Sequence, residues 1–129
     1  MLEAGLKGEQ KVMVTQENTA KVYGSGALEV FATPAMIALM EKTCLMSVAP
    51  SLKEGEGTVG TKIDVSHVAA TPVGMKVRCE SVLKEVDRRR LVFEVKAYDA
   101  AGLIGEGVHE RFVILNEPFM GKAGAKLSK

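Results

Sequence analysis

An apolar run between two prolines constrains the fold of this chain more than any other feature. Residues 33–50 begin with Thr-Pro and end at Pro50, and the residues between are apolar around nearly the whole circumference of a helix. Proline fits the first turn of a helix but not its interior, so the two prolines set the limits of one helix. A helix that is apolar all round is expected to be buried, so the rest of the chain must cover it.

The rest of the chain has the alternation and the turn residues of strands. A short strand is expected at residues 11–15, before the helix, and four more at 58–67, 75–86, 91–98 and 103–115. Consecutive strands joined by tight turns pair antiparallel. These segments predict an α+β fold in which an antiparallel sheet of about five strands wraps around one central buried helix. Gly105 and Gly107, in the last strand, would let the helix pack close to the sheet.

Length and composition bound the possibilities further. The 129 residues suit one domain, 1–129, with a core at about 10–118 and a mobile tail at 121–129. The net charge of +1 gives no positive field for a nucleic acid. No stretch reaches a membrane-spanning length, and Cys44 and Cys79 are expected as reduced, buried thiols, so a cytoplasmic protein without a metal site is predicted.

Glu41 is the one acidic residue inside the apolar helix. A carboxylate among apolar residues is costly to bury unless it is paired, hydrogen-bonded or protonated. Glu41 is therefore a candidate catalytic residue, and a narrow solvent-facing seam formed with Lys42 is the alternative.

The strand that ends at His67 is expected to direct alternate residues toward the helix. These residues are Val59, Thr61, Ile63, Val65 and His67. A neutral imidazole there could accept a proton near pH 7, although a structural core histidine would give the same pattern. His109 alternates with Gly107 and Arg111 on the last strand, so it could also face a site.

Thr33 is expected to cap the helix, and its hydroxyl would then lie beside free backbone amides that favour developing negative charge. Eight residues separate Thr33 from Glu41, and at about 1.5 Å per residue they would lie about 12 Å apart along the axis. Either the helix starts after Thr33, or two subunits contribute to one site. Arg111 could pair with Glu41 or with a substrate, or form a structural ion pair with Glu110.

The order of one helix and four strands, with the run HVAATPVG at residues 67–74, resembles the hot-dog fold thioesterases over roughly residues 10–118. Within that superfamily, the functional residues of the fluoroacetyl-CoA thioesterases are similar at matching separations. The matching residues are Thr33, Glu41, Gly60, His67 and Arg111. This spacing favours His67 over His109.

The resemblance implies hydrolysis of a small acyl-CoA thioester, with Thr33, Glu41 and His67 catalytic. It also implies substrate-binding roles for Gly60, Arg111, Ala27 and Phe31, an active site at a homodimer interface, and no cofactor. The resembled enzyme has a phenylalanine gate in the region equivalent to residues 27–31, whereas this chain has Ala27 at that position. The resemblance therefore implies the reaction but not the fluoroacetyl group.

Two alternatives to this activity stay open at this level. Hot-dog relatives also hydrate enoyl-CoA with a neighbouring aspartate and histidine, but Asp64 and His67 do not have that spacing. A non-catalytic acyl-CoA sensor would usually carry a DNA-binding segment, and none fits before residue 11. The basic run at residues 88–90 could hold CoA phosphates or simply form a solvated turn.

Exposed sheet edges in so small a domain favour at least a dimer.

Overall fold

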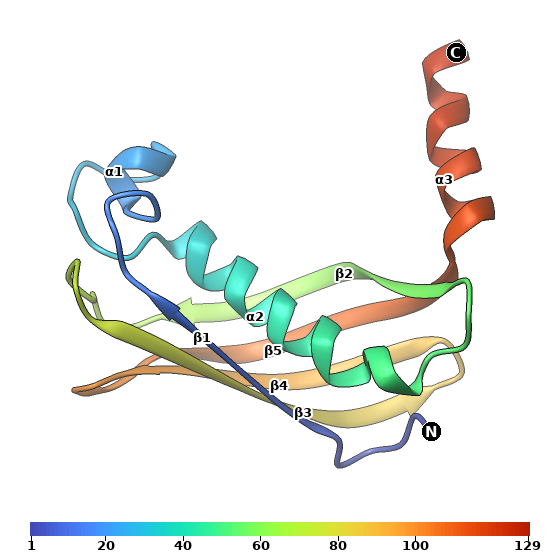
Figure 1. Ribbon diagram of the computed structural model, residues 1–129, viewed down its shortest axis with the longest axis horizontal. Helices are drawn as coiled ribbons and strands as arrows, with labels where there is room; N and C mark the ends of the chain where they lie inside the picture. The colour runs from blue at the N-terminus through green and yellow to red at the C-terminus, as the bar shows by residue number, and fades with distance from the viewer.

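A five-stranded antiparallel sheet with one long helix across it forms the body of the molecule (Figure 1). The computed structural model describes all residues, 1–129. The strands are β1 (Lys7–Met13), β2 (Glu56–His67), β3 (Lys76–Asp87), β4 (Arg90–Asp99) and β5 (Gly102–Leu115). Their order in the sheet is β1-β3-β4-β5-β2, so β1 and β2 are its two edges. The predicted α+β architecture is confirmed.

The long helix, α2 (Thr33–Val48), begins as the two prolines predict but has a different cap. Its N-cap is Ala32, which is extended and offers no side-chain hydrogen bond, so the prediction of Thr33 as the cap is wrong. Thr33 is already the first helical residue, and Pro34 lies beside it in the first turn. The helix ends before Pro50, which belongs to the short 3-10 helix η1 (Ala49–Ser51).

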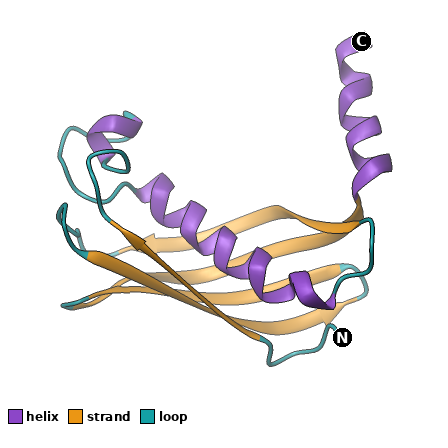
Figure 2. Cartoon of the chain, viewed as in Figure 1, coloured by secondary structure: helices purple, strands orange, loops and turns teal.

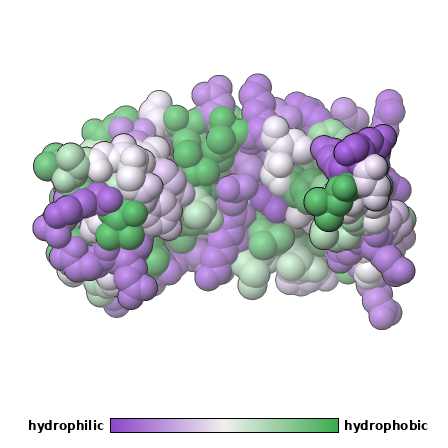
Figure 3. Space-filling view, turned by 90° about the horizontal axis from the view of Figure 1, so that it is seen from above, coloured by the Kyte–Doolittle hydropathy of each residue, from purple (hydrophilic) through white to green (hydrophobic).

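Only one side of α2 is buried, because the sheet curves around one face of the helix and leaves the other uncovered. The buried side includes Met36, Met40, Cys44 and Val48, which join the strand residues of the core. The opposite side leaves Leu45 and Met46 exposed. The expectation of a helix buried all round is therefore wrong for the single chain. Figure 3 shows hydrophobic patches among hydrophilic ones on the face seen from above.

A bulge in β2 changes which residues face the helix. The pairing of β2 with β5 shifts between Gly60 and Lys62, so that Thr61 is an extra residue in the ladder. Gly60, Ile63 and His67 therefore pair with the inward-facing side of β5, whereas Val59 pairs with exposed Phe112. The predicted alternation is right for residues 63–67 and wrong for residues 59–61.

Glycines in β5 allow two different close approaches. A Cβ on Gly105 would meet the Met36 sulfur of α2 at 2.5 Å, so the predicted helix contact exists here. A Cβ on Gly107 would instead meet the backbone of β2 at Val65, 2.6 Å away. Gly107 thus allows β5 and β2 to lie close together, and it does not make room for the helix.

The segment between β1 and α2 lies at one end of the sheet, beside the turn that precedes β3 (Figure 2). β1 begins four residues earlier than predicted, and the short helix α1 (Ala20–Tyr23) follows it. Two isolated bridges, Thr19 with Phe31 and Val30 with Pro72, hold the chain that leads into α2. This end of the fold therefore has a defined shape without a further strand.

The C-terminal residues form a helix that projects from the end of β5 (Figure 1). It consists of α3 (Asn116–Gly124) followed by the 3-10 helix η2 (Ala125–Ser128). All of these residues are exposed, and the mobility expected for residues 121–129 stays a prediction. None of the helices has the length and apolar composition needed to span a membrane.

Both cysteines are buried and unpaired, as expected. Burial is the largest cause that raises the pKa of the Cys44 thiol, to about 12. Cys79 is affected in the same direction, since burial also raises the pKa of its thiol. Both side chains therefore act as small apolar groups in the core.

Candidate active site

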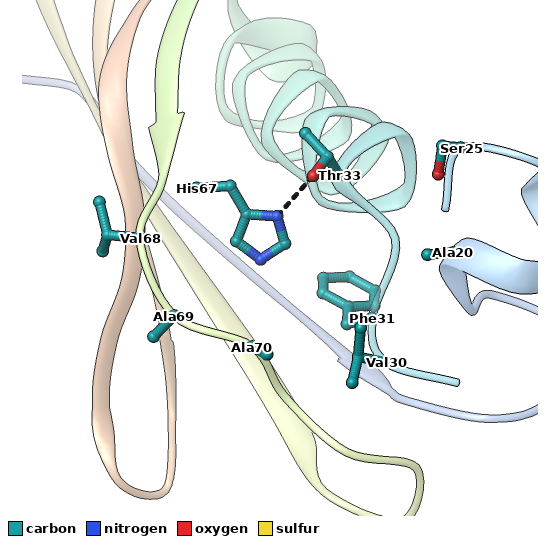
Figure 4. Close-up of a pocket in the computed structure, with 9 residues that line it drawn as sticks. All are labelled: Ala20, Ser25, Val30, Phe31, Thr33, His67, Val68, Ala69 and Ala70. Carbon is teal, nitrogen blue, oxygen red and sulfur yellow. Dashed lines mark hydrogen bonds between the residues drawn. The ribbon is translucent and has the colours of Figure 1, made fainter. Parts of the chain in front are cut away.

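The last residue of β2 and the first residue of α2 meet at one end of the molecule. The Thr33 Oγ1 atom lies 2.7 Å from His67 Nδ1, across 34 residues of sequence. Figure 4 shows the His67 ring projecting from the end of its strand toward the start of the helix. The other ring nitrogen, His67 Nε2, is buried and has no hydrogen-bond partner. The structure thus brings two of the three predicted catalytic residues together.

The surroundings of this pair suit proton transfer. Burial lowers the pKa of His67, so its imidazole is neutral and able to accept a proton at pH 7. The first turn of α2 has no side-chain cap, and its first helical hydrogen bond is donated by the Met36 amide to Ala32. Pro34 has no amide hydrogen, so the amides of Thr33 and Ala35 are the ones free to stabilise negative charge beside the Thr33 hydroxyl.

A cavity of about 300 Å³ opens next to the pair. Its lining residues are Ala20, Ser25, Val30, Phe31, Thr33, His67, Val68, Ala69 and Ala70 (Figure 4). Phe31 is almost fully buried and forms part of the wall, and its contact with a substrate stays a prediction. Ala27 is exposed and lies outside this lining, so its contact with a substrate stays a prediction.

Glu41 lies further along α2, in a second cluster of polar residues. Its Oε2 atom is 3.8 Å from Arg111 Nη1, and its side chain is 44% exposed. The distance is too long for a hydrogen bond, so the carboxylate is paired by charge and keeps its oxygens free. Glu110, the other predicted partner of Arg111, instead accepts a 2.9 Å hydrogen bond from Arg90 Nε.

Arg111 is buried on the inner face of β5 and is held by three hydrogen bonds. Its Nε donates to Thr58 Oγ1 at 2.8 Å, and its Nη2 donates to the Thr58 carbonyl at 2.9 Å. Its Nη1 lies 3.1 Å from His109 Nε2. Burial lowers the pKa of Arg111 and Glu41 opposes that shift, and an arginine remains a cation in this setting.

Gly60 explains how the Glu41 carboxylate fits against β2. A Cβ on Gly60 would lie 2.7 Å from Glu41 Oε2 and 3.1 Å from His109 Cε1. The absence of a side chain therefore leaves the space that the carboxylate occupies. The predicted site residues Gly60, Glu41 and Arg111 thus lie together.

His109 belongs to this second cluster, whereas His67 lies with Thr33 beside the cavity. Its Nδ1 atom lies 2.7 Å from the Lys62 carbonyl, and its side chain is 1% exposed. The alternation of His109 with Arg111 was the available sequence signal. The Lys62 partner could not be foreseen, because it depends on the bulge in β2.

The two clusters do not meet within one chain. Because α2 begins at Thr33, the alternative of a later helix start is wrong. Thr33 and Glu41 are separated by about two turns of one helix, roughly 12 Å along its axis. Within residues 1–129, no group of three or more His, Cys, Asp or Glu side chains is arranged to hold a metal ion.

Comparison with known proteins identifies relatives with this fold. A family model described as fluoroacetyl-CoA-specific thioesterase matches residues 14–117. A fluoroacetyl-CoA thioesterase from Streptantibioticus cattleyicolor is 48% identical over 98 residues, which cover 76% of this chain and 70% of that protein.

Solved structures agree with the sequence matches. A structure of the fluoroacetyl-CoA thioesterase FlK is 39% identical, covers 98% of both chains and superimposes with a TM-score of 0.92. A thioesterase superfamily member from Thermus thermophilus is 26% identical, covers 99% of this chain and 97% of its own, and has a TM-score of 0.88. A hot-dog-like protein from Thermanaerovibrio acidaminovorans, 24% identical, covers 97% of this chain and 93% of its own and shares the fold, with a TM-score of 0.88.

The matched segment contains both clusters, from Thr33 to Arg111, and extends over most of the sheet and the whole of α2. With its hot-dog fold, this chain therefore belongs to the fluoroacetyl-CoA-specific thioesterase family and is an acyl-CoA thioester hydrolase.

Proposed function

We propose that the chain hydrolyses small acyl-CoA thioesters as a homodimer, at a composite site in which Thr33 and His67 of one subunit face Glu41 of the partner subunit. The observation that carries this proposal is the unpaired, buried Nε2 atom of His67. When Nδ1 accepts the Thr33 hydroxyl proton, Nε2 carries a hydrogen that needs an acceptor. A carboxylate is the group that would both accept this hydrogen bond and stabilise the imidazolium formed during proton transfer.

The geometry of α2 supports a partner as the source of that carboxylate. Thr33 and Glu41 are equally distant from Ile37 in sequence. In two antiparallel helices paired around Ile37, Thr33 of each would lie opposite Glu41 of the partner subunit. The half-exposed side chain of Glu41 is compatible with such an approach.

Two exposed surfaces favour a second copy of the chain. β2 is an edge strand, and its residues 60–64 are exposed although the strand continues on both sides. Unpaired strand edges are commonly covered by pairing with another strand. Across a twofold axis, β2 of one subunit would pair with β2 of its partner, so the same strand would cover the edge in both subunits. The uncovered side of α2, with Leu45 and Met46, would be buried by the same association.

The chemistry follows from these positions. His67 accepts a proton from the Thr33 hydroxyl or from a water molecule, and the resulting oxygen nucleophile attacks the thioester carbonyl carbon. The free amides of α2 stabilise the tetrahedral oxyanion, and its collapse breaks the carbon–sulfur bond and releases CoA. His67 returns its proton to the departing CoA thiolate. When water is the nucleophile, this step yields the free acid directly. When Thr33 is the nucleophile, the step leaves an acyl ester on Thr33, which a water molecule deprotonated by His67 then hydrolyses to the acid and free Thr33. Trapping an acyl group on Thr33 or on Glu41 would distinguish these routes.

The cavity favours a small acyl group. Its volume is about 300 Å³, and most of its lining residues are hydrophobic, which suits a short apolar chain. The exposed Ala27 takes no part in closing it. We therefore place short acyl chains, rather than one particular fluorinated acyl group, among the substrates.

Charge and cysteine chemistry support a cytoplasmic enzyme with a small-molecule substrate. The net charge of +1 offers little attraction for nucleic acids or anionic membranes. Two unpaired thiols are typical of a reducing compartment. Fractionation of the producing cells would test this location.

The first experiment measures thiol release from short, branched, aromatic and long acyl-CoAs by the wild type and by Glu41→Gln, His67→Ala and Thr33→Ala. We expect turnover of short acyl-CoAs and its collapse in the Glu41 and His67 variants. Glu94→Gln is the matched control, because Glu94 is an exposed carboxylate on β4. Wild-type protein that binds CoA esters but releases no thiol would contradict the proposal.

The composite site is tested by mixing two inactive subunits. In a heterodimer of Glu41→Gln and His67→Ala, one of the two sites would contain only wild-type residues. Random mixing of equal amounts would then restore about a quarter of the wild-type activity. No recovery, with heterodimers demonstrated by mass spectrometry, would show that each site uses residues of one subunit.

A further inference from the structure

His109 is a buried histidine that the proposed reaction does not use. It lies on the inner face of β5, 1% exposed, two residues before Arg111. Its ring is stacked on Phe93 of β4, with centroids 6.4 Å apart and an interplanar angle of 27°. Both of its ring nitrogens have partners, unlike those of His67. A buried imidazole that is stacked on an aromatic ring and has partners at both nitrogens needs an explanation.

The partners of His109 determine its tautomer. The Lys62 carbonyl can only accept, so Nδ1 must carry a hydrogen and donate it over 2.7 Å. The guanidinium of Arg111 can only donate, so Nε2, 3.1 Å from Nη1, must be the acceptor. His109 is therefore the neutral Nδ1–H tautomer.

The same contacts set the direction of Arg111. Two of its nitrogens are bonded to Thr58, and the third, Nη1, both bonds His109 and lies 3.8 Å from Glu41 Oε2. His109 thus anchors the nitrogen that faces the carboxylate. Without an acceptor at Nε2, Nη1 would lose its hydrogen-bond acceptor, and the guanidinium would be held beside Glu41 only through its two bonds to Thr58.

We propose that His109 is a positioning residue of the thioesterase site, which as the Nδ1–H tautomer accepts a hydrogen bond from Arg111 and thereby fixes the guanidinium beside Glu41. This inference rests on the proposed function of Glu41. The bulge at residues 60–62 is part of the same arrangement, because it supplies the Lys62 carbonyl that orients the ring.

Protonation of His109 would remove the acceptor and place a second cation beside Arg111. The ionisable groups around it are Arg111 and Glu110 on β5 and Glu41 on α2. Burial is the main cause that lowers the pKa of His109, and the Arg111 charge acts in the same direction. The neutral form is thereby maintained through the pH range near neutrality.

Two isosteric substitutions separate the two ring nitrogens. His109→Gln places its amide oxygen near the Nε2 position and keeps an acceptor for Arg111, whereas His109→Asn keeps a donor for the Lys62 carbonyl and removes that acceptor. We expect kcat to fall about 10- to 100-fold in His109→Asn, with little change in KM, because Glu41 loses its orientation. His109→Gln should retain most of the wild-type kcat.

Stability and spectroscopy keep the test independent of folding defects. Thermal melting of both variants shows whether a loss of kcat reflects unfolding. Nitrogen-15 spectra of labelled histidine report the tautomer directly, and His67→Ala assigns the signals because the chain has two histidines. An Nε2–H tautomer for His109, or equal kcat in both variants, would overturn the positioning role.

Failure of the proposed function gives a different result. In that case the wild type releases no thiol from any acyl-CoA. An active wild type in which His109→Asn turns over normally would contradict the positioning role alone.

Discussion

The Thr33–His67 pair and the cluster around Arg111 contain similar groups but differ in completeness. The first is joined by one hydrogen bond and leaves His67 Nε2 buried and unpaired. In the second, Arg111 makes three hydrogen bonds and both ring nitrogens of His109 have partners. A polar cluster satisfied by its own chain can serve the fold, whereas the unpaired nitrogen of His67, beside a cavity, is the feature that supports the proposed partner carboxylate.

The largest expected effect comes from removing His67, which tests whether the Thr33–His67 pair contributes to activity or to the fold. His67→Ala should lower kcat by about 10²- to 10⁴-fold, because the proposed general base is lost. The melting temperature should change little, since the ring has a single hydrogen bond in the fold. Thiol release and thermal melting measure the two effects, with Ser66→Ala as the control at an exposed neighbouring position. A large loss of stability would mean that the pair is structural.

Truncating Arg111 should reduce stability in addition to any activity that depends on Glu41. Arg111→Met leaves the Thr58 carbonyl and His109 Nε2 without their donor, which should lower the free energy of unfolding by about 1–3 kcal/mol. Urea denaturation measures this change. Arg88→Met is the matched control, because the Arg88 side chain is 94% exposed. Equal stability of the two variants would show that burial of Arg111 contributes nothing net.

Adding one methyl group at Gly60 should sharpen the distinction between the fold and the site. Gly60→Ala would push the Glu41 carboxylate away, because the added carbon would lie 2.7 Å from its Oε2. We expect kcat to fall about tenfold, because a small displacement of a catalytic group is sufficient for such a loss. Gly121→Ala, which has open space around it, should leave the activity unchanged.

The smallest expected effect is the pH dependence of stability. Burial lowers the pKa values of His67 and His109 below the usual 6.5, so the unfolded chain binds protons first as the pH falls. Their neutral forms therefore stabilise the fold fully above about pH 6.5, and the free energy of unfolding should decrease below it. Urea titrations at pH 7.5 and 5.5 measure the decrease, which His109→Gln should reduce. If the difference in the free energy of unfolding between the wild type and His109→Gln were the same at both pH values, this prediction would be contradicted.

The positions of the helix and strands could be predicted from the sequence better than the contacts around them. The helix between two prolines and the four following strands could be derived because proline position and two-residue alternation are local properties. The cap at Ala32, the bulge after Gly60 and the exposed side of α2 could not, because each depends on contacts between distant segments.

The candidate site shows the same limit. Glu41 stood out because it is an acidic residue in an apolar helix, and the structure gives it a cationic partner. The contact between Thr33 and His67 came only from resemblance, since no local pattern joins residues 34 positions apart. The proposed role of His109 was hidden because its partner is a backbone carbonyl, which every residue possesses.

The bulge in β2 also determines to which face of the sheet each side chain of the strand points. Gly60 and His67 are seven positions apart, an odd number, and in a regular strand they would point to opposite faces. The extra residue at Thr61 reverses the alternation once, so both reach the inner face. A single-residue deletion there would turn one of them outward while leaving every side chain of the site unchanged in kind. Spacing in this strand is thus as much a determinant of the enzyme as the identity of its residues.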